Sequence, residues 1–414
     1  MQFEQFSLDP RIAAGIKTAG YTIPTPIQVQ AIPVALQRRD ILGLAQTGTG
    51  KTAAFLLPIL QRLSTSPSRQ VRALIIVPTR ELAEQIHQTA IALGKNLRVR
   101  SVTVYGGVSK NRQVEALRNG ADIVAACPGR LLDLLGERSI KLSNIEMLVL
   151  DEADRMCDMG FLPDIRRILQ QVPARRQTMF FAATMPDEIR KLADSILHNP
   201  ATVQVGIIAP TDTVSHALYP VPQFLKTALA IDLLHQRATG RVLIFTRTKH
   251  RAHSLAAKLK NAHFRTSSLE GNMSQNQRQA ALDGFRTGRF DILVATDIAA
   301  RGIDVSNISH VINFDMPDSV DAYIHRIGRT GRAQATGAAF TFCLPEDEGM
   351  IRDIERILKS AIKRERLPGF DYSQRAPEIP ARPNRPTQPQ AAFSRSARNR
   401  PVFHAGRAAQ GNAA

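Results

Sequence analysis

The sequence Met147-Leu148-Val149-Leu150-Asp151-Glu152-Ala153-Asp154 decides the fold of this chain. Its first four residues are apolar and predict a strand that is buried on both faces, as in a parallel sheet. Its last four residues include three carboxylates directly after that strand. Open sheets of this kind bind ligands at the carboxyl ends of their strands. We therefore expect the carboxylates to lie at a ligand site.

A second segment, residues 45–52, fits a phosphate-binding loop. Gly48 and Gly50 allow a tight turn with inward N–H groups, Lys51 can reach the β- and γ-phosphates, and the Thr52 hydroxyl can ligate magnesium. Ala45 stands where such loops usually begin with glycine. A glycine-rich turn is the alternative, but an apolar strand precedes the loop and an apolar helix follows it. The expected ATP-binding residues here are Ala45, Gln46, Thr47, Gly48, Thr49, Gly50, Lys51 and Thr52.

The two segments together predict a site for a nucleoside triphosphate and Mg²⁺. Asp151 is the expected magnesium partner, directly or through water, and Glu152 is expected to polarise the attacking water. Arg329 and Arg332 lie beside glycines in residues 325–332, and an arginine finger accelerates phosphoryl transfer about a thousandfold or more. A basic surface loop is the alternative. We predict that Lys51, Asp151, Glu152, Arg329 and Arg332 are catalytic and that Thr52 and Asp151 bind magnesium.

Apolar runs alternate with helical patterns through residues 40–345 and predict an α/β fold with two doubly wound parallel sheets. The expected strands are 40–45, 73–78, 99–105, 122–126, 147–150 and 178–182, then 242–245, 265–269, 291–295, 310–314 and 338–344. The expected helices include 52–63, 80–93, 130–135, 187–197, 249–262, 275–285 and 346–366. The expected domains are 1–205 and 214–368, joined by a linker at 206–213 and followed by a tail at 369–414. The tail is rich in Pro and Arg and poor in aliphatic residues, so we expect it to be disordered and basic.

The composition indicates a polyanionic partner. Lys and Arg outnumber Asp and Glu by 54 to 36, a formal net charge of +18, which favours nucleic acid first and an anionic membrane surface second. A basic tail that only solubilises the chain is the alternative. The three cysteines, Cys127, Cys157 and Cys343, have no metal-type spacing and suit a reducing compartment. The polar N-terminus and the lack of an apolar run near about 18 residues predict a cytoplasmic protein without membrane segments.

Residues 3–366 resemble the DEAD-box RNA helicases, ATP-dependent enzymes of superfamily 2, and most of all the bacterial branch with a short basic tail. The resemblance implies two RecA-like domains that close around ATP and single-stranded RNA, and that separate short duplexes or remodel RNA–protein complexes. It implies that residues 20–28 select adenine: the Gln28 amide can pair with adenine N6 and N7, and Tyr21 is placed to stack. Phe3 resembles the family's upstream aromatic residue, and Asp304 the residue that touches the ATP ribose.

The resemblance also implies RNA contacts near strand ends, through basic side chains or free backbone N–H groups. Such contacts reach phosphates and carry no sequence information, so low sequence specificity is expected. His325 and Arg326 resemble the residues that link the RNA-bound and ATP-bound states. The residues that match RNA contacts are Pro78, Thr79, Arg80, Gly106, Gly107, Pro128, Gly129, Arg130, Gln275, Arg278, Thr296 and Asp297.

Two positions depart from the family pattern. The family usually has Ser-Ala-Thr where this chain has Ala182-Ala183-Thr184, and that serine normally helps to tie the acidic motif to the cleft. We expect Ala182 to leave hydrolysis intact and to weaken its coupling to unwinding. Cys127 stands where threonine is common; it either removes a hydroxyl contact to RNA or is neutral.

Two other functions remain open at this stage. One is an RNA clamp that closes on ATP without catalysis. Ala182 slightly supports it, and the intact catalytic residues oppose it: Lys51, Glu152, Arg329 and Arg332. The other is a DNA helicase or remodelling motor, which the adenine and acidic motifs oppose. We expect a monomer whose tail holds RNA near the core, with a passive tail as the alternative.

Overall fold

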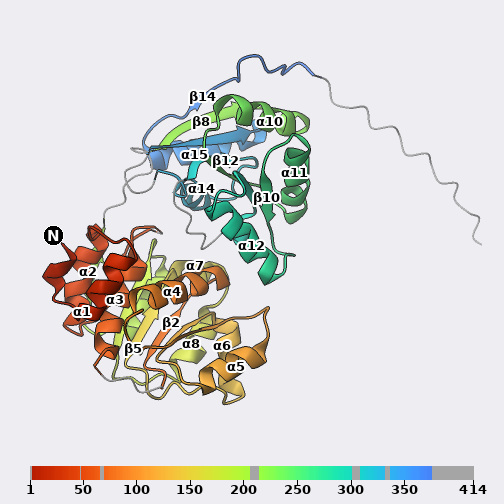
Figure 1. The fold of residues 1–414 in the computed structure, drawn as a ribbon. Coiled ribbons are helices and arrows are strands. Elements are labelled where there is room, and N and C mark those ends of the chain that lie inside the picture. Colours follow the sequence, from red (N-terminus) through yellow and green to blue (C-terminus); the bar gives the residue numbers. More distant parts are fainter. Residues whose placement is uncertain are drawn as a thin grey trace, which may run out of the picture. The chain divides into compact units, whose positions relative to one another are not determined.

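The computed structural model describes residues 2–46, 48–65, 70–205, 214–300, 308–331 and 336–374. Several sequence-based predictions fall outside these residues. They are Thr47, Asp304, Arg332, the linker 206–213 and the tail from residue 375. The chain up to Ser373 forms one compact unit, Met1–Ser373, which contains two sheets (Figure 1).

The first sheet has seven short parallel strands. They are β1 (Ile41–Leu44), β2 (Ala73–Ile76), β3 (Ser101–Val104), β4 (Ile123–Ala126), β5 (Met147–Leu150), β6 (Gln177–Ala182) and β7 (Ala201–Gln204). Their order is β3-β4-β2-β5-β6-β1-β7. In β5, Met147 and Val149 pack into the core on one face, while Leu148 and Leu150 pack into the core on the other. Burial on both faces explains why this strand is apolar without interruption.

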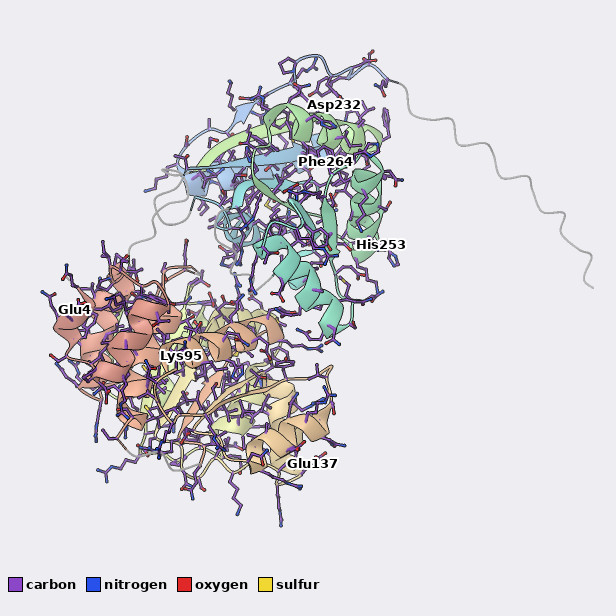
Figure 2. All side chains as sticks on the ribbon, in the orientation of Figure 1. Glu4, Lys95, Glu137, Asp232, His253 and Phe264 are labelled. Carbon is purple, nitrogen blue, oxygen red and sulfur yellow. The ribbon has the colours of Figure 1, made fainter. Side chains whose placement is uncertain are left out.

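Helices cover both faces of the first sheet (Figure 1). One face packs against α1 (Pro10–Thr18), α2 (Pro26–Leu36), α3 (Lys51–Leu63) and α4 (Arg80–Leu93), preceded by the short η1 (Phe3–Phe6). The other packs against α6 (Pro128–Gly136), α7 (Ala153–Asp158), α8 (Leu162–Leu169) and α9 (Asp187–Ile196), with α5 (Lys110–Arg118) at the edge strand β3. Charged side chains such as Glu4, Lys95 and Glu137 are exposed outside these cores (Figure 2).

The second sheet repeats the architecture. Its strands are β8 (Val214–Pro220), β9 (Arg241–Phe245), β10 (Thr266–Leu269), β11 (Ile292–Ala295), β12 (Ile308–Asn313), β13 (Gly337–Cys343) and β14 (Lys363–Arg364). Their order is β10-β11-β9-β12-β13-β8-β14, all parallel. The α/β fold with two parallel sheets, predicted from the sequence, is confirmed.

Three groups of helices pack on the second sheet. One face carries η2 (Gln223–Leu225), α10 (Lys226–Arg237) and α11 (Lys249–Asn261). The other carries α12 (Gln275–Arg286) and α13 (Asp297–Ala300), while η3 (Pro345–Asp347) leads into α15 (Glu348–Leu358), which packs with α14 (Val320–Ile327) beside β8 and β13. No helix in the described ranges is long and apolar enough to cross a membrane.

The predicted helix 346–366 was wrong. The helix α15 ends at Leu358, because Lys359 adopts a left-handed backbone conformation with φ 53°. The segment then returns to the sheet, where residues 363–364 form β14 beside β8. The basic residues at 363–364, expected to complement a helix dipole, instead pair with acidic side chains: Lys363 with Glu365, and Arg364 with Glu348.

The described part of the chain also extends past residue 369, the expected start of the tail. Phe370 is buried in the core of the second sheet, and Tyr372 packs against it. The Tyr372 hydroxyl accepts a hydrogen bond from the Leu367 backbone N–H at 2.9 Å. Phe370 and Tyr372 thus add apolar contacts to the core of the second sheet.

The parallel strands bring the predicted site residues to one edge of each sheet. The phosphate-binding loop follows β1, Thr79 follows β2, Gly106 follows β3, and Asp151 follows β5. In the second sheet, Thr296 and Asp297 follow β11. All of these residues lie after the carboxyl ends of strands, where ligands of open α/β sheets bind.

Candidate active site

The phosphate-binding loop places a buried cation next to a buried carboxylate. Gly48 and Gly50 have φ values of 82° and 96°, which favour glycine. Lys51 begins α3 and is 5% exposed. Its Nζ donates to the Ala45 carbonyl at 2.8 Å and lies 3.7 Å from Asp151 Oδ1. The loop therefore presents a positive charge to its interior, as phosphate binding requires.

Gln28 joins the start of α2 to this loop. Its Oε1 accepts a hydrogen bond from the Thr25 backbone N–H at 3.0 Å, and its Nε2 donates to the Gly50 carbonyl at 3.0 Å. A Cβ at Gly50 would lie 2.6 Å from Gln28 Nε2, so a side chain at this position would disrupt the link. The structure thus brings Gln28 to the loop. Phe3 and Tyr21 meet edge to face nearby, with ring centroids 6.2 Å apart.

The pKa values of two carboxyl groups in the acidic motif, Asp151 and Glu152, are shifted in opposite directions. Burial and the charge of Glu152 raise the pKa of Asp151 to about 6, against the opposing effect of Lys51. Burial also acts on Glu152, but the charges of Arg155, Lys51 and Arg329 outweigh it and lower the pKa of that carboxyl. Arg155 Nη1 donates to Glu152 Oε2 at 2.9 Å, and both side chains are buried. Glu152 is therefore held as an oriented carboxylate.

Arg155 was not among the predicted site residues. It lies three positions after Glu152, at the start of α7, which is a spacing that brings side chains together on a helix. That spacing was the available signal.

Asp154 is tied to the loop after β6. Its Oδ2 accepts hydrogen bonds from the backbone N–H groups of Ala183 at 3.0 Å and Thr184 at 2.9 Å, and from Thr184 Oγ1 at 3.1 Å. Ala182 is fully buried at the end of β6, and its carbonyl accepts from the Ala45 backbone N–H at 3.0 Å. The acidic motif and this loop are thus connected without a hydroxyl at position 182.

Predicted RNA-contacting residues of the first domain gather after β2, β3 and β4. The Arg80 guanidinium lies against Gly107, where a Cβ would come within 2.0 Å of Nη1. Thr79 caps α4 by accepting from the Leu82 backbone N–H at 3.3 Å. Pro128 and Gly129 open α6, and Arg130 Nη1 donates to the Val108 carbonyl at 3.4 Å. These residues form an edge with two guanidinium groups, two helix N-termini and a glycine-rich turn.

Cys127, which departs from the family pattern, precedes this edge at the N-cap of α6. Burial and the nearby Glu81 raise its thiol pKa to about 12. The side chain is therefore a neutral thiol and not a reactive thiolate.

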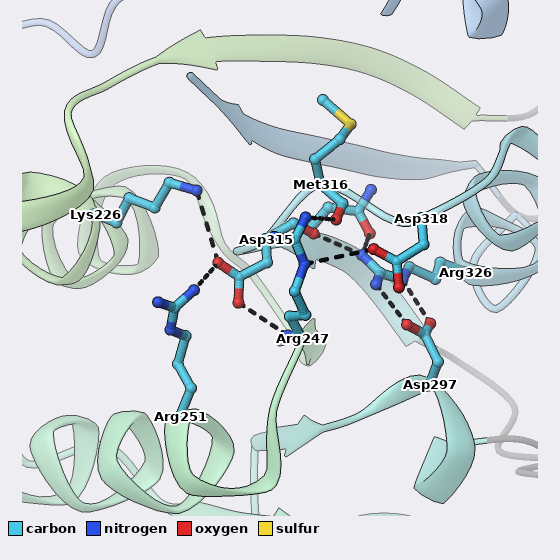
Figure 3. A network of polar contacts seen from close by, with 9 residues as sticks. Lys226, Arg247, Arg251, Asp297, Asp315, Met316, Asp318 and Arg326 are labelled. Atoms are coloured by element: carbon cyan, nitrogen blue, oxygen red, sulfur yellow. Dashed lines mark hydrogen bonds and ion pairs between the residues drawn. The ribbon is translucent and has the colours of Figure 1, made fainter. Parts of the chain in front are cut away.

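Arg326 is the centre of a polar network in the second domain (Figure 3). Its Nε and Nη2 each donate to Asp297 at 2.6 Å, and its Nη1 donates to Asn313 Oδ1 at 3.2 Å and the Asp315 carbonyl at 2.7 Å. The guanidinium also lies 5.1 Å from the centroid of the Phe245 ring. Arg326 therefore joins the ends of three strands to α14. Asp297, predicted to contact RNA, is engaged by this arginine.

Asp315 anchors a second part of the same network. Its carboxylate accepts from Arg251 Nη1 at 2.5 Å and from the Arg247 backbone N–H at 2.9 Å, and Lys226 Nζ lies 3.7 Å away (Figure 3). The Asp315 side chain is 4% exposed. Sequence reasoning missed this residue, because a single carboxylate after a strand has no distinctive spacing.

Four further predicted residues belong to the second domain: Gln275, Arg278, His325 and Arg329. Arg278 Nε donates to Glu81 Oε1 at 2.6 Å. Arg329 is 4% exposed and contributes to the lowered pKa of Glu152. Burial, with the charges of Arg155 and Arg329, lowers the pKa of His325 to about 4. Gln275 is buried at the start of α12, and neither side-chain amide atom has a hydrogen-bond partner.

Comparisons with known proteins agree with this arrangement. A family of DEAD/DEAH box helicases matches residues 25–192, and the helicase conserved C-terminal domain matches residues 225–334. The ATP-dependent RNA helicase CshA of Listeria monocytogenes is 40% identical over 371 residues, covering 89% of this chain and 71% of that protein. DEAD-box ATP-dependent RNA helicase 40 of Oryza sativa subsp. japonica is 43% identical over 369 residues, covering 87% of this chain. The chain spans 46% of the length of the rice protein.

The structure of S. cerevisiae Dbp5 bound to RNA and ADP BeF3 is similar with a TM-score of 0.79 and 30% sequence identity. The match covers 88% of this chain and 95% of the yeast chain. Both sheets and their sequence motifs are thus shared with the same family. The chain belongs to the DEAD-box ATP-dependent RNA helicases, and its two sheets are the tandem RecA-like domains of that family.

Proposed function

We propose that this protein hydrolyses ATP when RNA is bound and uses the energy to separate short RNA duplexes locally or to remodel RNA–protein complexes. The observation that carries the proposal is the buried group of Lys51, Asp151 and Glu152 at the carboxyl edge of the first sheet. Predicted RNA-contacting residues lie along the same edge. An enzyme that couples nucleotide state to RNA binding requires both sets of residues.

The phosphate-binding loop and the acidic motif divide the chemistry. Lys51 binds the terminal phosphates, and Glu152, oriented by Arg155, accepts a hydrogen bond from the attacking water. Arg329 stabilises the charge that develops on the transferred phosphoryl group. Its removal is expected to slow hydrolysis about a thousandfold.

Magnesium fits the oxygen donors of this site. No group of three or more His, Cys, Asp or Glu side chains suited to a metal occurs in the described part of the chain. Mg²⁺ usually keeps several waters and takes one or two protein oxygens with phosphate oxygens. Thr52 and Asp151 would supply the protein oxygens, and the bound ion would neutralise phosphate charge.

Gln28 supports selection of adenine. Its amide already holds Thr25 and the Gly50 carbonyl, so base recognition and the phosphate-binding loop share one side chain. An adenine that pairs with the remaining hydrogen-bonding capacity of that amide would help to order the phosphate-binding loop. A different base would leave the amide imperfectly paired.

RNA is expected to bind through its backbone. Arg80, the turn at Gly106 and Gly107, and the start of α6 at Pro128 offer a cation and backbone N–H groups. Phosphate contacts of this kind carry no sequence information. Binding to a single strand should weaken with salt, with a slope of about 0.7 per phosphate contacted.

Measurement of phosphate release tests the proposal. The protein should release phosphate from ATP faster with single-stranded RNA than with DNA of the same sequence, and Glu152→Gln should abolish release while RNA binding persists. Equal stimulation by DNA would favour a DNA motor. RNA binding without stimulated release in the unmodified protein would favour the clamp.

A further inference from the structure

We propose that α11 and the groove beside it form an additional binding site for single-stranded RNA, on the flank of the second domain. The groove has a volume of about 410 Å³ and lies between η2, the start of α10 and one side of α11. The proposal extends the proposed function, because it concerns RNA that continues past the carboxyl edge of the sheet.

The helix α11 carries only positive charge. Its sequence, residues 249–261, contains one lysine, one arginine and two histidines near its start, two further lysines near its end, and no aspartate or glutamate. Lys249, His250 and Arg251 occupy the first turn, which has no acidic residue. Cations are disfavoured there, because the positive end of the helix dipole adds to their charge. An anionic ligand would relieve this repulsion.

Only part of this charge is neutralised inside the protein. Arg251 pairs with the buried Asp315, whereas Lys249 donates to the neutral side chain of Asn272 at 2.9 Å. His253 is exposed on the outer side of α11 (Figure 2). The surface along the helix is therefore electropositive.

The groove adds an aromatic side chain to this surface. Phe224 is 43% exposed, one of four exposed large apolar side chains among the described residues. It lines the groove together with polar and basic groups of α11, and none of the lining residues is acidic. The other lining residues are Gln223, Thr227, Thr248, His250, Arg251, Ser254, Leu255, Lys258 and Phe314.

An exposed ring beside cations is the combination that binds single-stranded nucleic acid, since bases stack on the ring and phosphates meet the cations. The groove begins at Thr248, which caps α11 directly after the carboxyl end of β9. This end of the groove therefore lies at the same edge of the second sheet as the predicted RNA contacts Thr296 and Asp297, which follow the neighbouring strand β11. A helix of 13 residues extends the surface by about 20 Å. In this arrangement a base stacks on Phe224 and a phosphate meets Lys258.

The experiment compares a short oligouridylate, which fills only the strand-end site, with one several times longer. Phe224→Ala and Lys258→Gln should each weaken binding of the long RNA about tenfold and leave binding of the short RNA unchanged. Lys258→Gln should also reduce the salt slope for the long RNA by about 0.7. Photocrosslinking of 4-thiouridine in the long RNA should label the peptide that contains Phe224.

Two matched variants serve as controls. Lys260→Gln removes the same charge from the same helix turn, but Lys260 does not line the groove. Ile357→Ala removes another exposed apolar side chain, 59% exposed, from α15. Both should bind the two RNAs as the unmodified protein does.

Equal affinity of the variants and the unmodified protein for the long RNA would overturn the proposal, as would equal losses for both RNAs. ATP hydrolysis with the short RNA should be the same in all four variants. Absence of RNA-stimulated hydrolysis in the unmodified protein would instead contradict the proposed function, so the two failures are distinguishable.

Discussion

Thr184 Oγ1 donates a hydrogen bond to Asp154 Oδ2 at 3.1 Å, and two backbone N–H groups, of Ala183 and Thr184, converge on the same oxygen. Asp154 belongs to the acidic motif after β5, whereas Thr184 follows β6. One carboxylate therefore connects the segment after β5, which includes Asp151, to the loop after β6.

Thr184→Val removes the hydroxyl donor and keeps both backbone donors. We expect the free energy of unfolding to fall by about 0.5–1.5 kcal/mol, the usual contribution of one hydrogen bond. The number of duplexes separated per ATP hydrolysed should fall as well. Thr184→Ser, which keeps the hydroxyl, is the matched control. If Thr184→Val separates as many duplexes per ATP as the unmodified protein, this hydrogen bond does not contribute to the coupling of hydrolysis to unwinding.

Ala182→Ser restores the hydroxyl that the family usually has. Because one neutral hydrogen bond contributes about 1 kcal/mol, we expect a rise in duplexes separated per ATP, with hydrolysis little changed. The measurement is strand separation and phosphate release in the same reaction. If the number of duplexes separated per ATP does not rise, Ala182 does not weaken coupling.

Asp151 should set an acid limb of activity. Its pKa is raised to about 6, and only its carboxylate form can bind magnesium, so kcat/KM for ATP should fall as the pH drops below about 6. His325 cannot cause this limb, because its pKa is lowered to about 4. The folded protein holds the Asp151 proton more tightly than the unfolded chain does, because the pKa of this carboxyl is near 3.8 when the chain is unfolded. The stability that Asp151 contributes is therefore present below pH 3.8 and is lost as pH rises through about 6. A value of kcat/KM for ATP that does not change between about pH 5 and 7 would contradict the assignment of this limb to Asp151.

Arg326→Lys tests the polar network of the second domain. Lysine cannot make the two parallel bonds to Asp297 or reach Asn313 at the same time. Breaking a buried pair costs about 3–5 kcal/mol when one charge is left unpaired, and the lysine keeps a charge, so we expect a loss at or below the lower end. Arg286→Lys, at the exposed pair with Asp283, should cost less than about 1 kcal/mol. Denaturant unfolding of both variants makes the comparison, and equal losses would show that the network adds nothing.

Gly107→Ala should weaken RNA binding. The added Cβ would lie 2.0 Å from Arg80 Nη1, and the φ of 81° is strained for alanine. The arginine must move, so we expect RNA affinity to fall while ATP affinity in the absence of RNA is unchanged. Gly349→Ala is the control, because its Cβ would meet no atom within 4 Å. Unchanged RNA affinity in Gly107→Ala would remove Arg80 from the RNA site.

Local patterns accounted for most of the strands and for the placement of the charged motifs, whereas β7, β8 and β14 were not predicted. The apolar run 147–150 and the glycines at 48 and 50 predicted a buried strand and a phosphate-binding loop, because each pattern is contained within neighbouring residues. Prediction failed where a local pattern suggested one structure but contacts with a distant segment decided another. Residues 346–366 carry acids first and bases last, like one helix, yet the left-handed Lys359 ends α15 and β8 captures residues 363–364.

The sequence by itself determined the fold class and the family, and it predicted the positions of the nucleotide and RNA motifs. Only the tertiary structure decided which side chains hold these motifs in place. Arg155 orients Glu152, Asp154 accepts three hydrogen bonds from residues 183–184, and Arg326 holds Asp297. Apart from the first, these partners are separated along the chain. They meet because parallel strands deliver their carboxyl ends to one edge of a sheet, whatever their order in the sequence.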